Sequence, residues 1–140
     1  SAMQSIAHIE NEIVEEFDLF DDQMDKYEYI IDLGKKLAVL DSKYLTDDFL
    51  VKGCQSKVWL HAYEKEGRIF FEADSNTAIT KGIIALLIRV LSGQNAKDIL
   101  SSPLSFIDKI NLRSHLSSQR SNGLSAMIVK MKAYAQSFAQ

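Results

Sequence analysis

The 140-residue sequence contains one cysteine, one proline and no excess of basic residues. A single thiol excludes an internal disulfide. It also excludes a four-cysteine metal site or an iron–sulfur cluster held by this chain alone. With 16 basic and 19 acidic residues the net charge is −3, so no basic surface indicates nucleic-acid binding. No apolar run reaches the length of a membrane-spanning helix. We therefore expect no metal, nucleic acid or membrane among the ligands.

The composition is typical of one globular domain. A chain of 140 residues is long enough to bury a core without disulfide staples, and 46% hydrophobic with 25% charged residues is an ordinary balance. We interpret residues 1–3 as a tag remnant with the start of the protein, and we expect a single domain over 4–140. No secretory signal opens the sequence, so we expect a cytoplasmic location.

Hydrophobic periodicity predicts two helices in the first part of the chain. Apolar residues recur at helical spacing over 6–20 and again over 24–40. Gly34 interrupts the second helix at a cost of about 1 kcal/mol relative to alanine, and a close contact between helices would explain it. Residues 41–56 have weaker periodicity and several turn formers, so they predict an irregular connection.

A β-hairpin is predicted next. The runs KVWLHAYE (57–64) and RIFFEAD (68–74) are rich in strand-forming residues, and a Gly-containing turn separates them. Alternate side chains of the first strand should face opposite sides, with Val58, Leu60 and Ala62 on one side and Trp59, His61 and Tyr63 on the other.

A long helix should follow the hairpin, with a cap at Ser75 or Asn76 and an end at Gly93. The dipeptide Lys81-Gly82 lies inside this helix, where glycine is destabilising. Close packing against the sheet would explain this glycine without any function. It is no phosphate loop, because no glycine-rich turn precedes it.

Shorter helices are expected after that point. Asn95 is placed to cap a short helix, and Pro103 occupies the favoured first position of another. The last helix should begin after a cap at Ser121 or Asn122. Helices, a small antiparallel sheet and further helices together predict an α+β fold.

The only cysteine, Cys54, lies in the stretch LVKGCQSKVWL (50–60). The thiolate is the reactive form of cysteine, and the flanking Lys52 and Lys57 would favour that charged form. Gly53 can adopt backbone angles closed to other residues, so it can present the thiol from a tight loop. These features favour a reactive thiol, and a packed cysteine without chemistry is the alternative.

A cysteine–histidine hydrolase is a further alternative. Among the three histidines His115 is the strongest candidate base, because it precedes a polar stretch, whereas His8 is expected to face solvent and His61 lies in a strand. Sequence spacing does not place any of them beside Cys54.

Several blocks together resemble the SufE family of sulfur-acceptor proteins in iron–sulfur cluster assembly. They are YEYIIDLGKKL (27–37), VKGCQSKVWL (51–60), ADSNTAITKGIIALLI (73–88) and HLSSQRSNGLSAM (115–127). The resemblance extends from about Phe17 to the end, and the block around the cysteine is the most diagnostic. It implies an α+β fold akin to the cluster scaffold proteins, with a small antiparallel sheet packed by helices.

The resemblance also implies a role for Cys54. In this family a cysteine desulfurase with pyridoxal phosphate (PLP) takes sulfur from free cysteine and holds it as a persulfide. The acceptor cysteine then attacks the outer sulfur, and Cys54 matches that acceptor. The resemblance implies a protein that binds no metal and no cofactor of its own. It also implies a SufS-like desulfurase as partner, a transient persulfide on Cys54 and a downstream iron–sulfur scaffold complex as recipient. Such a protein would be an accessory to the desulfurase rather than a stand-alone enzyme, and a non-catalytic adaptor is the alternative.

Other positions match the family's blocks as candidate loop and partner-binding residues. A loop at Gly53–Ser56 would swing outward to reach a partner, and Val51 and Trp59 are candidate walls around the resting thiol. Arg120 would contact the partner or act as a strut for the loop. A structural role is the alternative for each of the matched positions, which are Gly53, Gln55, Ser56, Asp74, Ser75, Lys81, His115, Arg120 and Asn122.

Overall fold

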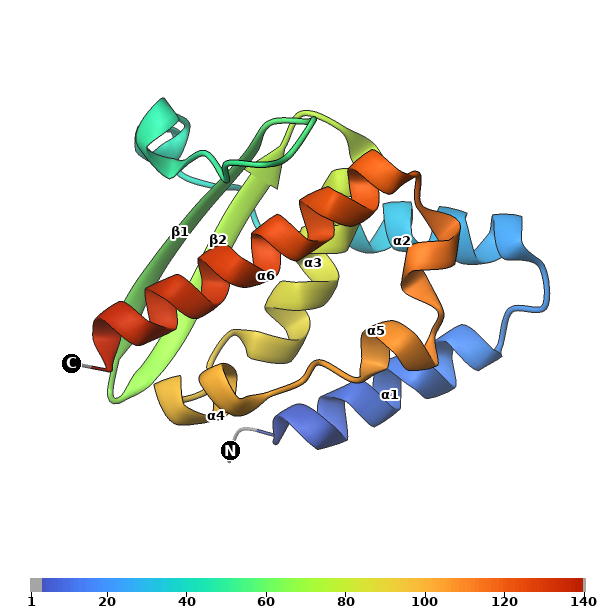
Figure 1. Cartoon of the computed structure of the whole chain (residues 1–140), viewed down its shortest axis with the longest axis horizontal. Helices are drawn as coiled ribbons and strands as arrows, with labels where there is room; N and C mark the ends of the chain where they lie inside the picture. The colour runs from blue at the N-terminus through green and yellow to red at the C-terminus, as the bar shows by residue number, and fades with distance from the viewer. Residues whose placement is uncertain (1–3, 140) are drawn as a thin grey trace.

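A two-stranded antiparallel hairpin packed by helices forms the fold, seen in a computed structural model that describes residues 4–139 (Figure 1). This architecture confirms the predicted α+β class. The interpretation of residues 1–3 as a tag remnant lies outside the described residues. The strands are β1 (Val58–Lys65) and β2 (Arg68–Ser75). The helices are α1 (Ile6–Asp18), α2 (Gln23–Lys35), α3 (Ala78–Leu91), α4 (Ala96–Ser101), α5 (Phe106–Lys109) and α6 (Ser118–Phe138). Short 3-10 turns are η1 (Ser42–Tyr44), η2 (Asp47–Phe49) and η3 (Leu112–His115).

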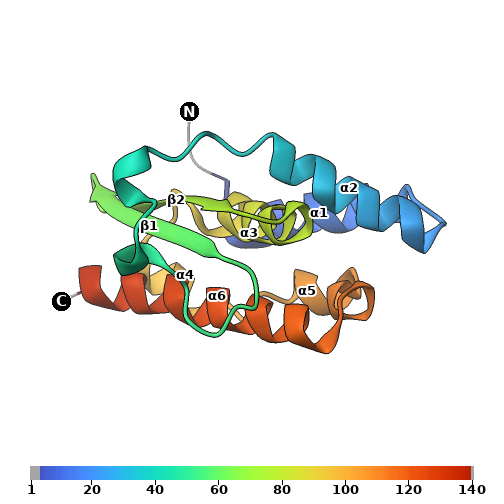
Figure 2. The same cartoon turned by 90° about the horizontal axis from the view of Figure 1, so that it is seen from above.

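The elements form three layers, which Figure 2 shows from above. The hairpin and α3 lie in the middle, α2 covers one side, and α4, α5 and α6 cover the other. Helix α3 is enclosed by other elements, so it is apolar around most of its surface. Within residues 4–139 no helix is both long enough and apolar enough to cross a membrane.

The predicted hairpin is confirmed. Its register pairs Val58 with Ser75 and Lys65 with Arg68, and a two-residue turn at Glu66 and Gly67 connects the strands. Both turn residues have positive φ, which suits the right-handed twist of a tight hairpin. The side chains predicted for one face of β1, at positions 58, 60 and 62, are buried against the helices. On the other face Trp59 is only half-buried and lies outside the core.

A contact between two glycines joins α2 to α3. A Cβ atom on Gly34 would lie 2.6 Å from the backbone nitrogen of Gly82, and one on Gly82 would lie 2.1 Å from the carbonyl oxygen of Ile30. The predicted helix contact at Gly34 is therefore confirmed. The prediction that Gly82 packs against the sheet was wrong, because its close neighbour is the backbone of α2.

The predicted caps were right for α4 and wrong for α3 and α6. Asn95 caps α4 by accepting a hydrogen bond from the Asp98 N–H at 2.8 Å. Helix α3 begins after Thr77 rather than after the predicted caps Ser75 or Asn76. Helix α6 begins at Ser118, after a cap in which the Ser117 hydroxyl accepts from the Arg120 N–H.

Pro103 does not start a helix, because the chain turns sharply just after it. The Ser102 hydroxyl accepts a hydrogen bond from the Leu104 N–H at 3.1 Å, and Leu104 has a φ of 50°. Helix α5 therefore begins only at Phe106, whose N–H donates to the buried carboxylate of Glu10 at 2.9 Å. A side chain from 96 residues away thus sets the start of this helix.

The glycine contact predicts a large loss of stability in Gly82→Ala. The added methyl group meets a backbone carbonyl that cannot move aside, so we expect the free energy of unfolding to fall by about 3 kcal/mol. Gly67→Ala is the control, because a Cβ there meets nothing within 4 Å and only its positive φ causes strain. We expect that change to cost about 1 kcal/mol. Urea unfolding measures both, and equal losses would contradict the steric explanation.

Candidate functional site

Cys54 lies near the tip of a short loop whose two ends are held together. The Val51 N–H donates to the Val58 carbonyl oxygen at 2.8 Å, and Leu50 forms an isolated bridge with Trp59. Between these anchors Gly53 has a φ of 92°, a conformation that L side chains rarely adopt. The thiol therefore sits on a narrow-necked loop that continues directly into β1.

The turn between β2 and α3 holds the second end of the loop. The Asn76 side-chain oxygen accepts from the Lys57 N–H at 3.0 Å, and the Ser75 hydroxyl donates to the Lys57 carbonyl at 2.8 Å. The Asn76 N–H donates to the same carbonyl at 3.2 Å. These two residues do not cap α3 as predicted, because their polar atoms bind the cysteine loop instead.

Arg120 joins the loop to two helices. Its Nη1 donates to the Ser56 hydroxyl at 3.0 Å and to the Thr80 hydroxyl at 2.9 Å. The Thr77 hydroxyl donates to the same Ser56 oxygen at 3.0 Å. Hydrogen bonds from a charged donor are stronger than neutral ones. Of the two roles expected for Arg120, this geometry corresponds to the strut for the cysteine loop.

The thiol points into a small cavity between the loop, α3 and α6. Its Sγ lies 3.6 Å from the carbonyl oxygen of Gly123, the acceptor of a weak hydrogen bond from the thiol. The cavity holds only about 10 Å³. The predicted walls Val51 and Trp59 were wrong, because neither lines it. Its lining is Cys54, Gln55, Ser56, Thr80, Ile83, Gln119, Arg120, Gly123 and Met127.

Burial raises the pKa of the Cys54 thiol above its ordinary value. The prediction that Lys52 and Lys57 would favour the thiolate was therefore wrong. Both lysines are exposed, so water screens their charge, while the thiol is half-buried. The resting thiol is consequently protonated at neutral pH, and it is less nucleophilic than a free cysteine.

The remaining candidate residues from the sequence analysis differ in whether they line this cavity. Asp74 forms an ion pair with Lys81 at 3.3 Å, which ties the end of β2 to the first turns of α3. Gln55 lines the cavity, whereas Asn122 is exposed on α6 and does not. Thr80 and Met127 escaped the sequence analysis, because a polar residue on an apolar helix and a core methionine carry no local signal.

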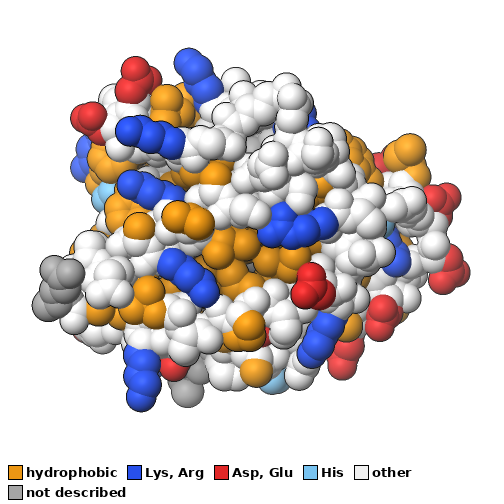
Figure 3. Space-filling view, viewed as in Figure 1, with side chains coloured by type: hydrophobic (Ala, Val, Ile, Leu, Met, Phe, Trp, Pro, Cys, Tyr) orange, Lys and Arg blue, Asp and Glu red, His pale blue; other side chains and the backbone are white. Residues whose placement is uncertain are grey.

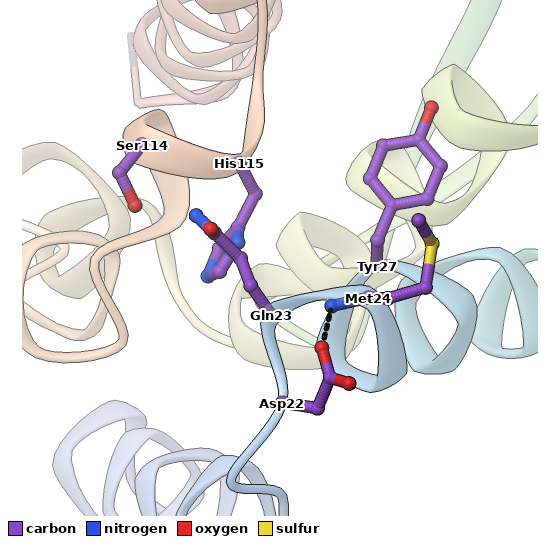
Figure 4. A pocket seen from close by; sticks show the side chains of 6 residues that line it. All are labelled: Asp22, Gln23, Met24, Tyr27, Ser114 and His115. Atoms are coloured by element: carbon purple, nitrogen blue, oxygen red, sulfur yellow. Dashed lines mark hydrogen bonds between the residues drawn. The ribbon is translucent and has the colours of Figure 1, made fainter.

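None of the histidines reaches the thiol. His8 pairs with Glu12 and His61 pairs with Glu72, each at the surface or on the outer face of the hairpin. His115 lies in a separate pocket between η3 and the start of α2, where its ring points toward Gln23 (Figure 4). Burial, with a contribution from the Lys26 charge, lowers its pKa. A cysteine–histidine hydrolase therefore has no base within this site.

The Arg120 clamp predicts that Arg120→Ala loosens the cysteine loop. We expect a small thiol reagent to label Cys54 roughly tenfold faster, because the loss of the charge-assisted hydrogen bond to Ser56 raises the population of open loops. Arg113→Ala is the matched control. Arg113 also donates from its guanidinium to serine side chains, on Ser121 and Ser125, but away from the cavity. Equal labelling rates in the two variants would contradict the clamp.

Burial of the thiol also predicts a displaced pH profile. The raised pKa lowers the thiolate fraction at any given pH. The labelling rate of the folded protein should therefore rise at higher pH than that of the urea-unfolded chain, with slower reaction at neutral pH. Cys54 is the only cysteine, so intact mass reports its labelling without ambiguity. Superimposable profiles for folded and unfolded protein would contradict the protonated resting state.

Comparisons of the sequence with known proteins agree on one family. The domain described as "SufE: Fe-S metabolism associated domain" matches residues 11–135. An uncharacterised SufE-like protein of Rhizobium meliloti is 35% identical over 90% of this chain and 94% of its own length. The sulfur acceptor protein CsdE of Escherichia coli is 35% identical over 74% of this chain and 71% of its own. SufE-like protein 1, chloroplastic/mitochondrial, of Arabidopsis thaliana is 38% identical over 89% of this chain but only 34% of that longer protein.

The fold is shared with a solved structure. The solution structure of a hypothetical protein from Thermus thermophilus matches with a TM-score of 0.76, covering 92% of this chain and 94% of that one. Its sequence identity is 18%, so this likeness shows the fold alone. Because the family domain matches residues 11–135 and two relatives are each 35% identical over 74% or more of this chain, the protein belongs to the SufE family.

Proposed function

We propose that this protein accepts sulfur on Cys54 from a cysteine desulfurase and carries it as a persulfide toward iron–sulfur cluster assembly. The single observation that carries the proposal is the lone thiol beside α6, on a loop that contains Gly53 with a positive φ and whose two ends are joined by the Val51–Val58 hydrogen bond. Membership of a family described by Fe–S metabolism supports it, and so does the similarity to a protein named a sulfur acceptor.

The transfer is a displacement at sulfur. The Cys54 thiol loses its proton to solvent, and its thiolate attacks the outer sulfur of the partner's persulfide. A bond forms between that sulfur and Cys54 Sγ, while the bond to the partner's cysteine breaks and its electron pair leaves on the partner's thiolate. The exchange needs no external oxidant or reductant, as in thiol–disulfide exchange.

The lone cysteine suits a carrier. A second thiol within reach would attack the persulfide, release sulfide and leave a disulfide, and this sequence has no second thiol. Removing sulfur also regenerates the partner's cysteine for another turnover. The acceptor would therefore stimulate the desulfurase without binding its PLP.

The loop must move for the thiol to reach a partner. The Val51–Val58 backbone bond would keep the neck closed, while Gly53 provides the backbone freedom for the tip to swing outward. This motion breaks the Arg120–Ser56 bond and exposes the thiol to water, which lowers the desolvation cost of the thiolate. Reactivity would then depend on the partner drawing the loop out.

The face that carries α6 is where the partner would approach. Figure 3 shows Lys and Arg side chains spread over this face around apolar ones, although the whole chain is acidic. Beside the loop lies a groove between η2 and α6, whose lining includes the exposed Val129 together with charged residues of both signs, namely Asp47, Asp48, Lys52 and Lys130. A SufS-like partner and a downstream scaffold complex are the proposed ends of the transfer. The expected cytoplasmic location stays a prediction, since the plant relative is named chloroplastic/mitochondrial.

Intact-protein mass spectrometry after incubation with a cysteine desulfurase and free cysteine tests the proposal. We expect a mass gain of one sulfur atom that a reductant removes. Cys54→Ser should show no gain and should abolish stimulation of the desulfurase, while its fold and its binding to the desulfurase persist. The serine differs by one atom in a half-buried position, so it is a conservative control.

Two results would contradict the proposal. Undiminished stimulation by Cys54→Ser would remove the thiol from the mechanism. No mass gain in the wild-type protein, with an active desulfurase and a verified complex, would indicate an adaptor that binds the desulfurase without accepting sulfur.

A further inference from the structure

The cavity beside Cys54 fits the bare thiol closely. The Sγ atom lies 3.6 Å from the Gly123 carbonyl oxygen, and a Cβ atom on Gly123 would lie 3.5 Å from Sγ, in ordinary van der Waals contact. The space left inside is about 10 Å³. A cavity of that volume holds at most one water molecule. A sulfur atom is larger than the oxygen of water, so a second sulfur on Cys54 would fit only tightly in the space beside the first.

The walls of the cavity cannot easily recede. Ile83 and Met127 are each 1% exposed, and both belong to the core between the hairpin, α3 and α6. Protein cores are close-packed, and forcing an extra atom into one costs about as much as losing a few neutral hydrogen bonds. The loop itself can move outward more easily, because Gly53, Gln55 and Lys57 are exposed to solvent.

The polar groups at the cavity also suit a thiol better than a persulfide. The Gly123 carbonyl accepts from an S–H group. The terminal sulfur of a persulfide is more acidic than a thiol, so it is largely an anion at neutral pH, and a carbonyl oxygen repels an anion. The cation at the cavity is Arg120, whose Nη1 donates to Ser56 and Thr80 rather than to the sulfur of Cys54.

We propose that the cavity accommodates the free thiol but not the persulfide, so that loading Cys54 with sulfur expels the Gly53–Ser56 loop into solvent. Ile83 and Gly123 are then positioning residues, because their contacts decide which form of Cys54 is stored. The inference rests on the proposed function only for the identity of the cargo. The empty carrier keeps its thiol half-buried and protonated, and the loaded carrier presents its sulfur to the next acceptor.

Hydrogen–deuterium exchange of peptides covering residues 52–57 tests this inference without any desulfurase. Inorganic polysulfide loads the thiol directly, because the thiolate takes one sulfur atom and a polysulfide shorter by one sulfur leaves. Intact mass verifies the loading. We expect the loop amides to exchange about tenfold faster in the loaded protein. Cys54→Ser treated in the same way should show no change.

An enlarged cavity separates the steric cause from other effects. Ile83→Val removes one methyl group from the wall, a change that buried positions usually tolerate. We expect loading to accelerate exchange clearly less in this variant than in the wild type. Val39→Ala is the matched control, since Val39 is 96% exposed and does not line the cavity. It should behave like the wild type.

The exchange experiment can contradict this inference without contradicting the proposed function, and the reverse also holds. Exchange in the loaded wild-type protein that is unchanged or slower would overturn the inference. Equal acceleration in wild type and Ile83→Val would overturn it as well, because cavity size would then not matter. If polysulfide expels the loop but a desulfurase never loads Cys54, the inference stands while the proposed function fails.

Discussion

The guanidinium of Arg120 connects the three parts of the molecule on which the site depends. It extends from α6, binds Thr80 on α3 and holds Ser56 in the cysteine loop. Without this clamp the loop would be held at its two ends, by the Val51–Val58 bond and the turn after β2, and at its tip by the Thr77–Ser56 bond and the weak bond from the thiol to Gly123. Such a network can store a thiol in one defined place and still release it, because each of its bonds is individually modest.

Burial and reactivity oppose each other at Cys54. Desolvation raises the pKa of the thiol, so the resting site does not contain an activated nucleophile. Many reactive cysteines are activated by a permanent neighbouring cation or helix terminus. Here the exposed lysines beside the loop do not serve that purpose. Activity in this protein would therefore be governed by loop position, and the partner would supply the change of environment.

Local pattern was a sound guide to the elements of this fold and a poor guide to where helices begin. Periodicity located the two N-terminal helices and the hairpin, because burial of one face acts through residues a few positions apart. The starts of α5 and α6 were misplaced. Several serines near each start could have served as caps, and long-range contacts decided between them. The carboxylate of Glu10 at the start of α5 is one such contact.

The sequence by itself determined the chemistry that is available: one thiol after a glycine, no partner cysteine, and blocks that resemble one family. The tertiary structure decided how that thiol behaves. The pKa direction, the clamp from Arg120 and the walls formed by Ile83 and Met127 all come from residues distant in sequence. Residue types are properties of the chain, whereas desolvation and cavity volume are properties of the packing around a point. Only folding brings those surroundings together.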